Sequence, residues 1–294
     1  MAIEKRPEAL ARAVELREAG PLLASGHRMP AVGFGTSGLA PGIDTEEAVK
    51  CAMIHGYRHF DCAAKYGNEI SVGVALKNSG IEREEFFITS KVWLDSMTYE
   101  GTIESCHRSI RDLKCQYLDL YLIHWPASPY KQPNWRDINL NVWRAMCDLY
   151  REGLVKSIGV SNCKELHLDD LLKSEIPPMV NQLEVHPGHA QRSLLKFSQD
   201  RNMVIQGWSP LGRSKVVRNE VVIEMARKYG RTPAQICLRY DWQLGVVPLP
   251  KAVNIDHVIT NLNFLNFEIS DEDMEVLHKL ENAQVGFSYE DPDM

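Results

Sequence analysis

The chain has 294 residues, with 33 Lys and Arg against 39 Asp and Glu, which gives a formal net charge of −6. This length suits two average domains or one large α/β barrel. Because the charges are spread along the chain and form no basic stripe, nucleic acid is not expected as a partner.

The N-terminal residues 3–18 are charged at nearly every second position, which excludes a signal peptide or a membrane span. A short helix is expected there, with Leu10 and Val14 on one face and Gly20-Pro21 at its end. The seven cysteines form no C-x-x-C pair, and their odd number indicates reduced thiols. We therefore expect a cytoplasmic protein without a membrane partner. Residues 1–20 would form a helical extension and residues 21–294 a single domain.

From residue 22 onward, short apolar or β-branched segments alternate with longer amphipathic ones, such as 45–55 and 99–113. Eight strands, each followed by a helix, predict a parallel sheet closed into a (β/α)8 TIM barrel. A small hairpin over 22–29 would precede the first strand. Two further helical patterns lie near 256–263 and 271–281, the second behind a capping signal at Ser270. Strands are expected near 31–35, 57–61, 86–90, 118–123, 155–160, 179–183, 204–208 and 245–249.

The segment Gly33-Phe-Gly35-Thr-Ser-Gly38 matches the G-x-G-x-x-G dinucleotide fingerprint, and Asp61 follows at a suitable distance. That fingerprint requires a helix that begins inside the glycines. Here the helical pattern begins only at Asp44, so we favour the barrel over a Rossmann fold.

Polar side chains follow three successive predicted strands: Asp61 with Tyr66, then Lys91, then His124. Parallel barrel strands point their carboxyl ends at one rim, so these four side chains should converge. Tyr66 can give a proton to a forming alkoxide. We expect the ammonium of Lys91, held by Asp61, to lower the pKa of Tyr66. His124 can donate a hydrogen bond to a substrate carbonyl oxygen.

The segment from Gly56 to Glu69, G-Y-R-H-F-D-C-A-A-K-Y-G-N-E, resembles the first signature of the aldo-keto reductase family, with Asn68 as the N-cap of the next helix. The four polar residues also resemble the family's catalytic tetrad. The resemblance extends over about residues 22–282 and is greatest to short-loop microbial members, the diketogluconate reductases and aldose reductases. It implies NAD(P)H-dependent reduction of aldehydes or ketones, with the hairpin closing the barrel floor.

The resemblance also implies where the cofactor binds. Ser161, Asn162 and Gln182 would hold the nicotinamide carboxamide, and Trp208 replaces the usual stacking tyrosine. Near the adenosine 2′-phosphate, His257 stands where arginine is usual, so NADP(H) is expected with NAD(H) possible as well. The expected cofactor contacts are Thr36, Ser161, Asn162, Gln182, Trp208, Ser209, Leu211, Lys251, Ala252, Val253, Asn254, His257 and Asn261.

Trp93 and Trp125, which follow Lys91 and His124, would form apolar walls for a small carbonyl substrate, including sugar-derived or 2-oxo compounds. No metal is expected, and the protein would be a monomer or a weak dimer. Two alternatives stay open. One is a Schiff-base aldolase with Lys91 as the nucleophile, although Asp61 stabilises the ammonium form of Lys91. The other is a barrel that binds cofactor as a sensor or regulatory subunit with little turnover.

Overall fold

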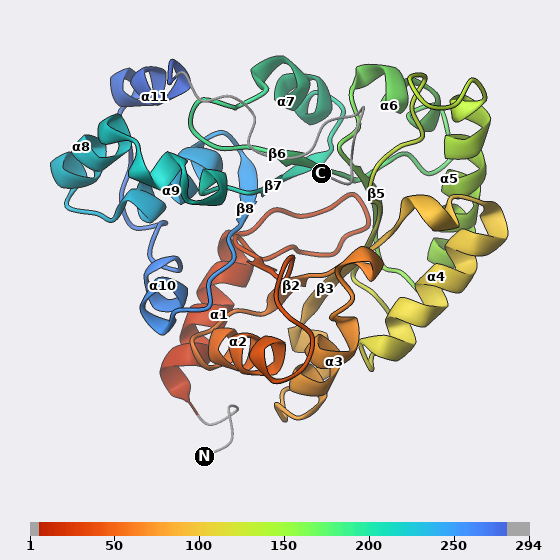
Figure 1. Cartoon of the computed structure of the whole chain (residues 1–294), viewed down its shortest axis with the longest axis horizontal. Helices are drawn as coiled ribbons and strands as arrows, with labels where there is room; N and C mark the ends of the chain where they lie inside the picture. Colours follow the sequence, from red (N-terminus) through yellow and green to blue (C-terminus); the bar gives the residue numbers. More distant parts are fainter. Residues whose placement is uncertain (1–5, 281–294) are drawn as a thin grey trace.

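Eight parallel strands, hydrogen-bonded in chain order, form the centre of the computed structural model, which describes residues 6–280 (Figure 1). The ring is closed because the N–H groups of Gly33 and Gly35 donate to the carbonyl oxygens of Pro248 and Pro250. The predicted (β/α)8 barrel is therefore confirmed. The strands are β1 Phe34–Gly35, β2 His59–Asp61, β3 Phe87–Val92, β4 Leu120–Ile123, β5 Ile158–Ser161, β6 Val180–Glu184, β7 Val204–Trp208 and β8 Val246–Leu249.

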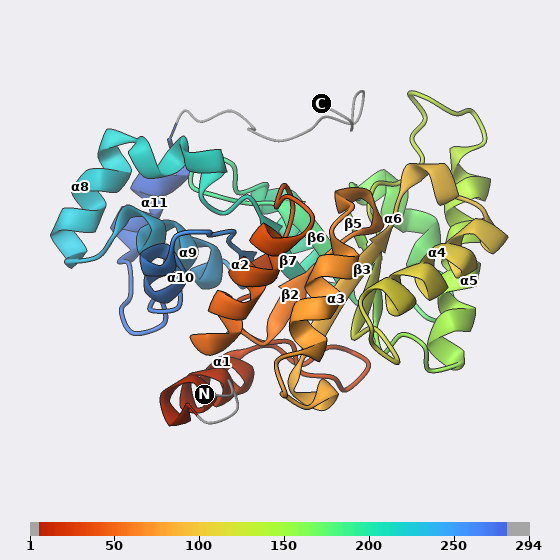
Figure 2. The same ribbon diagram turned by 60° about the horizontal axis from the view of Figure 1, so that its bottom comes forward.

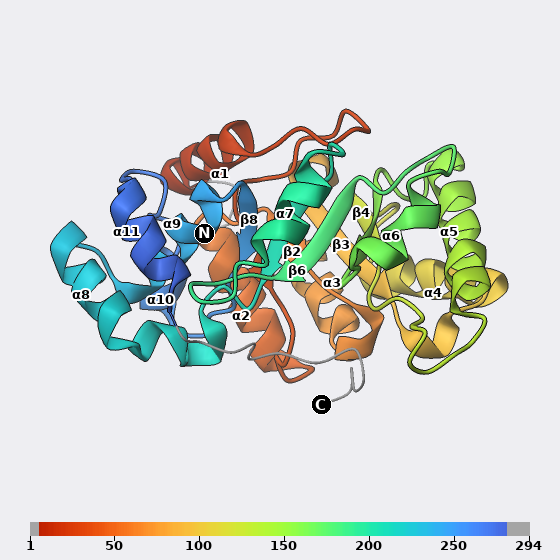
Figure 3. The same ribbon diagram turned by 90° about the horizontal axis from the view of Figure 1, so that it is seen from above.

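Helices surround the strands, as the view in Figure 3 shows. They are α2 Ile43–Ile54, α3 Glu69–Lys77, α4 Tyr99–Asp112, α5 Trp135–Arg151, α6 Glu165–Leu171, α7 Arg192–Gln199, α8 Glu220–Tyr229, α9 Pro233–Gln243, α10 Ile255–Thr260 and α11 Asp271–His278. The two patterns expected after the last strand are α10 and α11, and the Ser270 hydroxyl caps α11 by accepting from the N–H of Asp273. Two helices, α8 and α9, separate β7 from β8, which the sequence patterns did not predict.

The helix α1, Pro7–Ala19, precedes the barrel and lies beside its lower end in Figure 2. Its packed side chains are Ala9, Ala13 and Leu16, whereas Leu10 and Val14 are 48 % and 46 % exposed. The small alanines allow a close approach to the start of β2. A Cβ at Gly56 would lie 3.0 Å from the Ala9 carbonyl oxygen, so a side chain there would push α1 away.

The predicted hairpin is present between α1 and β1, where Leu22 and Arg28 form an antiparallel bridge. Its tip reaches the start of β5, because the hydroxyls of Ser25 and Ser157 are 2.7 Å apart. Met29, at its end, is fully buried and receives a contact from the Gln206 amide on β7. The hairpin therefore crosses the barrel end opposite the carboxyl ends of the strands.

Several features are absent from the part of the chain that the structure describes. Between residues 6 and 280, no helix has both the length and the apolar character to cross a membrane. No group of three or more His, Cys, Asp or Glu side chains in this range could hold a metal ion. The seven cysteines all lie in this range, and none of them is joined in a disulfide. The outer parts of the expected extension and barrel, residues 1–5 and 281–294, lie outside the described range.

Candidate active site

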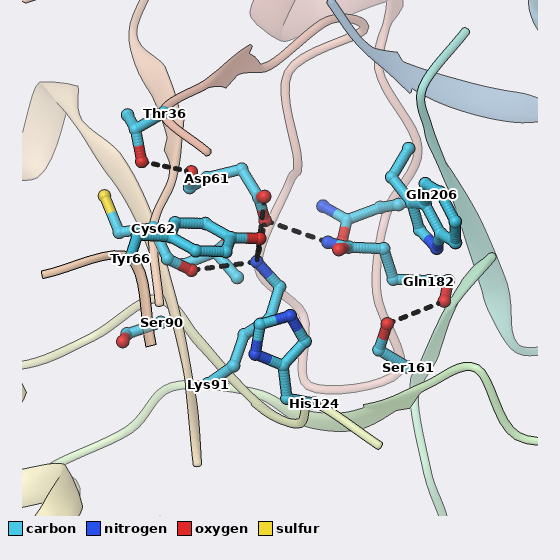
Figure 4. A network of polar contacts seen from close by, with 12 residues as sticks. Thr36, Asp61, Cys62, Tyr66, Ser90, Lys91, His124, Ser161, Gln182 and Gln206 are labelled. Carbon is cyan, nitrogen blue, oxygen red and sulfur yellow. Dashed lines mark hydrogen bonds and ion pairs between the residues drawn. The ribbon is translucent and has the colours of Figure 1, made fainter. Parts of the chain in front are cut away.

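Asp61, Tyr66, Lys91 and His124 meet at the carboxyl end of the barrel (Figure 4). The fully buried Lys91 ammonium donates to both Asp61 carboxylate oxygens at 2.9 and 2.8 Å. It also donates to the Cys62 carbonyl oxygen at 2.8 Å and reaches the Tyr66 hydroxyl at 3.4 Å. The strand register brings the pair together, since Asp61 lies beside Thr89 and Lys91 follows two residues later on the same face.

The charge of Lys91 is stabilised by this arrangement. Burial alone would lower the pKa of Lys91, but the Asp61 carboxylate and the Tyr66 hydroxyl outweigh it, so the pKa is raised. Burial also raises the pKa of Tyr66, and Lys91 offsets only part of that shift. The expectation that Lys91 would bring the Tyr66 pKa below its ordinary value is therefore wrong for the protein alone, because desolvation of the phenolate is the larger effect.

His124 follows β4 directly, and its ring packs against two aromatic side chains. The ring centres of Tyr66 and Trp93 lie 5.5 and 4.8 Å from it, both in edge-on arrangements. Burial, followed by the charges of Lys91 and Lys65, keeps the pKa of His124 well below its ordinary value, so the ring is neutral. Its Nδ1 is buried without a hydrogen-bond partner. The tautomer that carries its hydrogen on Nε2 is therefore the one that can offer a donor to a ligand.

A second layer of polar side chains lies next to Asp61 inside the barrel (Figure 4). The Gln182 amide nitrogen donates to Asp61 Oδ1 at 2.8 Å and to the Gln206 amide oxygen at 2.9 Å. Gln206 in turn lies 3.3 Å from Nε2 of His59, a neutral ring whose pKa is lowered to about 3, first by burial and then by Lys91. Sequence reasoning missed Gln206 and His59. Their positions two residues before Trp208 and Asp61, hence on the same strand face, were the available signal.

The expected carboxamide-binding residues lie together at the ends of β5, β6 and β7. The Ser161 hydroxyl donates to the Gln182 carbonyl oxygen at 2.9 Å. Asn162 adopts a left-handed backbone with φ of 60°, and its amide nitrogen donates to the His124 carbonyl oxygen and to Ser161 Oγ, each at 3.0 Å. The indole N–H of Trp208 donates to Asn162 Oδ1 at 2.9 Å. Asn162 thus connects Trp208 to the His124 segment.

Ser209 and Leu211 continue the chain beyond Trp208, and Ser209 is left-handed with φ of 52°. Lys251 follows β8, and a Cβ at Gly38 in the loop after β1 would lie 3.2 Å from its ammonium. Burial, followed by the charge of Arg213, lowers the pKa of Lys251. The loops after β1, β7 and β8 therefore approach one another around this ammonium.

The remaining predicted cofactor residues lie at or near α10. The Asn254 side chain caps this helix, accepting from the N–H groups of Asp256 and His257. His257 is exposed, Val253 is 73 % exposed and Ala252 is buried. Asn261 is 1 % exposed, and its side-chain oxygen has no hydrogen-bond partner.

Thr36 is buried beside Asp61, but its hydroxyl is used within the fold, donating to the Asp61 carbonyl oxygen at 2.9 Å. Asn68 occupies the N-cap position of α3, yet its side chain does not cap the helix. Its amide nitrogen donates instead to the carbonyl oxygens of Thr36 and Leu39, which fixes the loop after β1. The two expected pocket walls, Trp93 and Trp125, are 9 % and 5 % exposed.

Comparisons with known proteins identify a family and several relatives of this chain. A family model described as the Aldo/keto reductase family matches residues 31–282. The chain is 42 % identical to a glyoxal reductase of Bacillus subtilis, over 88 % of this chain and 91 % of the relative. It is 40 % identical to a 9,11-endoperoxide prostaglandin H2 reductase of Trypanosoma cruzi, over 88 % and 90 %. Among solved structures, an aldo-keto reductase of Bombyx mori in complex with NADP has a TM-score of 0.82 and 30 % identity, with 90 % and 94 % of the two chains covered.

Proposed function

The chain belongs to the aldo/keto reductase family, and we propose that it reduces small aldehydes or ketones to alcohols. A bound NADPH or NADH would supply a hydride to the carbonyl carbon, while Tyr66 supplies a proton to the oxygen. The observation that carries the proposal is the buried ammonium of Lys91, which contacts both Asp61 and the Tyr66 hydroxyl.

Tyr66 is suited to act as the general acid. Since burial raises its pKa, the phenol keeps its proton at neutral pH, which a proton donor requires. A forming alkoxide is a stronger base than a phenolate and can remove that proton. The Lys91 ammonium, 3.4 Å away, then stabilises the negative charge left on Tyr66.

His124 would orient the substrate carbonyl. Its neutral ring can donate from Nε2, and the edge-on contact with Trp93 restrains the direction of that donor. A hydrogen bond to the carbonyl oxygen would strengthen as negative charge grows on the oxygen. His124 and Tyr66 would thus both act on the same oxygen atom.

The residues at the ends of β5 to β7 fit a nicotinamide ring with its carboxamide. Both hydrogens of the Gln182 amide are already used, by Asp61 and Gln206, so its oxygen is the atom that can accept from a carboxamide N–H. The Ser161 hydroxyl, beside the Gln182 oxygen, can also contact the carboxamide. Asn162 has its oxygen and nitrogen engaged in the fold, so we assign it to holding the indole of Trp208 in place for stacking.

The loops after β1, β7 and β8 fit the adenosine end. The buried Asn261 oxygen lacks a donor, which an adenine amino group could supply. The Lys251 ammonium is placed for a phosphate, and the nearby charge of Arg213 adds to the positive potential. With His257 in place of a bidentate arginine, we expect NADP(H) to be favoured only modestly over NAD(H).

The contacts of Lys91 weigh against a Schiff-base aldolase. Such a lysine must lose its proton to attack a carbonyl, whereas Asp61 and Tyr66 raise the pKa of Lys91 despite its burial. A regulatory barrel would need the cofactor contacts but would not need Tyr66 and His124 beside each other. Their arrangement therefore favours the reductase over the regulatory barrel.

The test is a screen of NADPH and NADH oxidation against glyoxal, a short alkyl aldehyde, an aldose and a 2-oxo acid. We expect turnover with at least one carbonyl and with both cofactors, NADPH being preferred by less than about a hundredfold, the scale of two or three kcal/mol. Cofactor binding without oxidation by any carbonyl would overturn the proposed reductase and favour the regulatory barrel.

A further inference from the structure

A glutamine inside the barrel contacts the residue that would hold the nicotinamide carboxamide. Gln206 on β7 lies directly beside Gln182 of β6 in the strand register, and both residues are buried. The Gln206 amide oxygen accepts from the Gln182 amide nitrogen at 2.9 Å. The same nitrogen donates to Asp61 Oδ1 at 2.8 Å, and Figure 4 shows Gln182 reaching toward that carboxylate. Gln206 thus lies one hydrogen bond behind a residue of the expected nicotinamide site.

The carboxylate of Asp61 decides which way each amide is turned. A carboxylate can only accept, so Gln182 must present its nitrogen to Asp61. The second hydrogen on that nitrogen needs an acceptor, which the Gln206 oxygen supplies. The Gln206 nitrogen then lies 3.3 Å from Nε2 of His59 and 3.4 Å from the sulfur of Met29. Turning over either amide alone would bring two oxygens or two nitrogens together, so this chain of hydrogen bonds has one direction.

The far end of the chain is held by two buried acceptors. Burial, followed by the charge of Lys91, lowers the pKa of His59 to about 3, so the ring is neutral and its Nε2 can accept from Gln206. The His59 ring packs edge-on against Phe87, with the ring centres 4.8 Å apart. Met29 is fully buried at the end of the hairpin. Because both partners of its nitrogen are fixed by packing, Gln206 holds its oxygen toward Gln182.

We propose that Gln206 is a positioning residue, which orients the amide oxygen of Gln182 toward the carboxamide N–H of a bound nicotinamide. This inference rests on the proposed cofactor-dependent reduction. An amide nitrogen that donates to two fixed acceptors has the plane of its amide fixed, so the oxygen of that amide points in one direction. Without the Gln206 oxygen, the Gln182 amide would keep its bond to Asp61 but could turn about that bond. The carboxamide would then lose a preorganised acceptor.

The expected effect is that of one neutral hydrogen bond whose acceptor is no longer oriented. Loss of the Gln206 acceptor should therefore raise the Kd of NADPH by about three- to tenfold. The reduced 3-acetylpyridine analogue of NADPH carries an acetyl group in place of the carboxamide and has no N–H to donate to Gln182. The Kd of this analogue should change by less than about twofold.

The experiment measures the Kd of NADPH and of the analogue by quenching of intrinsic tryptophan fluorescence, in the full-length protein. Gln206→Met keeps an unbranched side chain of similar length without the amide, and Gln206→Leu repeats the loss with another shape. Gln206→Glu should restore NADPH binding, because a protonated carboxyl can accept from Gln182 and donate to His59. Gln243→Met on α9 is the matched control, since its amide is also engaged on both sides within the fold, by the backbone of Ile269.

The Kd of the analogue divided by that of NADPH should fall in Gln206→Met and Gln206→Leu, and should keep its wild-type value in Gln206→Glu and Gln243→Met. An equal loss of affinity for both molecules would overturn the inference, because a general disturbance of the barrel interior does not depend on the carboxamide. Unchanged affinity for both would overturn it as well. Reduction of any carbonyl by wild type leaves the proposed function standing in these cases, whereas a wild type that binds neither NADPH nor NADH would overturn both.

Discussion

The contacts of the Lys91 ammonium determine which substitutions can test the mechanism without destabilising the fold. It is fully buried and makes its shortest contacts with Asp61 and the Cys62 carbonyl. Removing one partner of such a buried pair leaves the other charge unpaired, at a cost of about 3–5 kcal/mol in folding free energy. The contact with Tyr66, at 3.4 Å, is long, so the tyrosine hydroxyl can be removed with little structural cost.

Tyr66→Phe should therefore retain the fold and the affinity for NADPH while it loses carbonyl reduction. We expect kcat to fall by about 10²–10⁴-fold, the usual contribution of general acid catalysis. Tyr130→Phe, which alters a tyrosine that is 66 % exposed, serves as the control. If Tyr66→Phe kept more than about half of the wild-type kcat, a different group would be the acid.

At the scale of elements, the carboxyl end of β8 and the helix α10 are the part of the expected cofactor site whose residues differ most from those that the family resemblance implies. The Asn254 side chain is occupied by the start of α10, where it accepts from two backbone N–H groups. His257 occupies the first turn of the same helix and is exposed to solvent. If His257 lies at the 2′-phosphate, as we propose, this position offers no permanent cation.

His257→Arg should raise discrimination in favour of NADPH. An arginine offers a permanent charge and two parallel donors to the 2′-phosphate, so the ratio of kcat/KM for NADPH over NADH should rise by about five- to thirtyfold, or about 1–2 kcal/mol. His107→Arg on the outer helix α4 is the matched control. A wild type that already rejects NADH, together with no change in His257→Arg, would show that another residue binds the phosphate.

At the scale of the whole molecule, one buried carboxyl opposes folding at neutral pH. Asp241, on α9, is fully buried, and neither of its carboxylate oxygens has a hydrogen-bond partner. It packs against β7, where a Cβ at Gly207 would lie 3.2 Å from Asp241 Oδ2. Burial raises the pKa of Asp241 well above its ordinary value, so the folded protein favours the protonated form.

Asp241→Asn should stabilise the protein more at about pH 8 than at about pH 5. Below the ordinary aspartate pKa, both states of wild type are protonated and no penalty arises. As pH rises, the unfolded carboxyl ionises while burial opposes ionisation in the fold, so stability falls until the raised pKa of folded Asp241 is reached. The difference in the free energy of unfolding between Asp241→Asn and wild type, measured by urea unfolding, should grow by at least about 1 kcal/mol between these pH values.

Asp170→Asn provides a control of opposite sign. Its hydrogen bond with Arg136 lowers the pKa of Asp170, so this carboxylate stabilises the fold above the ordinary aspartate pKa, and that contribution is lost as pH falls. The exposed pair of Asp170 and Arg136 should contribute little to the free energy of unfolding, and Asp170→Asn should not stabilise the protein at any pH. A gain for Asp241→Asn that did not change with pH would mean that Asp241 is ionised in the fold.

The sequence alone determined the barrel and the positions of its strand ends. Strand and helix periodicities are local properties, and a parallel barrel places every carboxyl end at one rim, so Asp61, Lys91 and His124 were expected to meet before any distance was known. The side chain of Ser270 was also predicted as a cap, because capping depends on residues only three apart.

Only the tertiary structure decided the properties that depend on surroundings. Asn68 has the sequence of an N-cap, but two carbonyl groups of the loop after β1 compete for its amide. The pKa of Tyr66 rises because desolvation outweighs the attraction of Lys91, and their balance depends on burial that no motif encodes. Lys65 appeared in the sequence only as a residue of the signature segment. Its contact with Trp93, which follows β3, arises because the barrel brings the ends of β2 and β3 together.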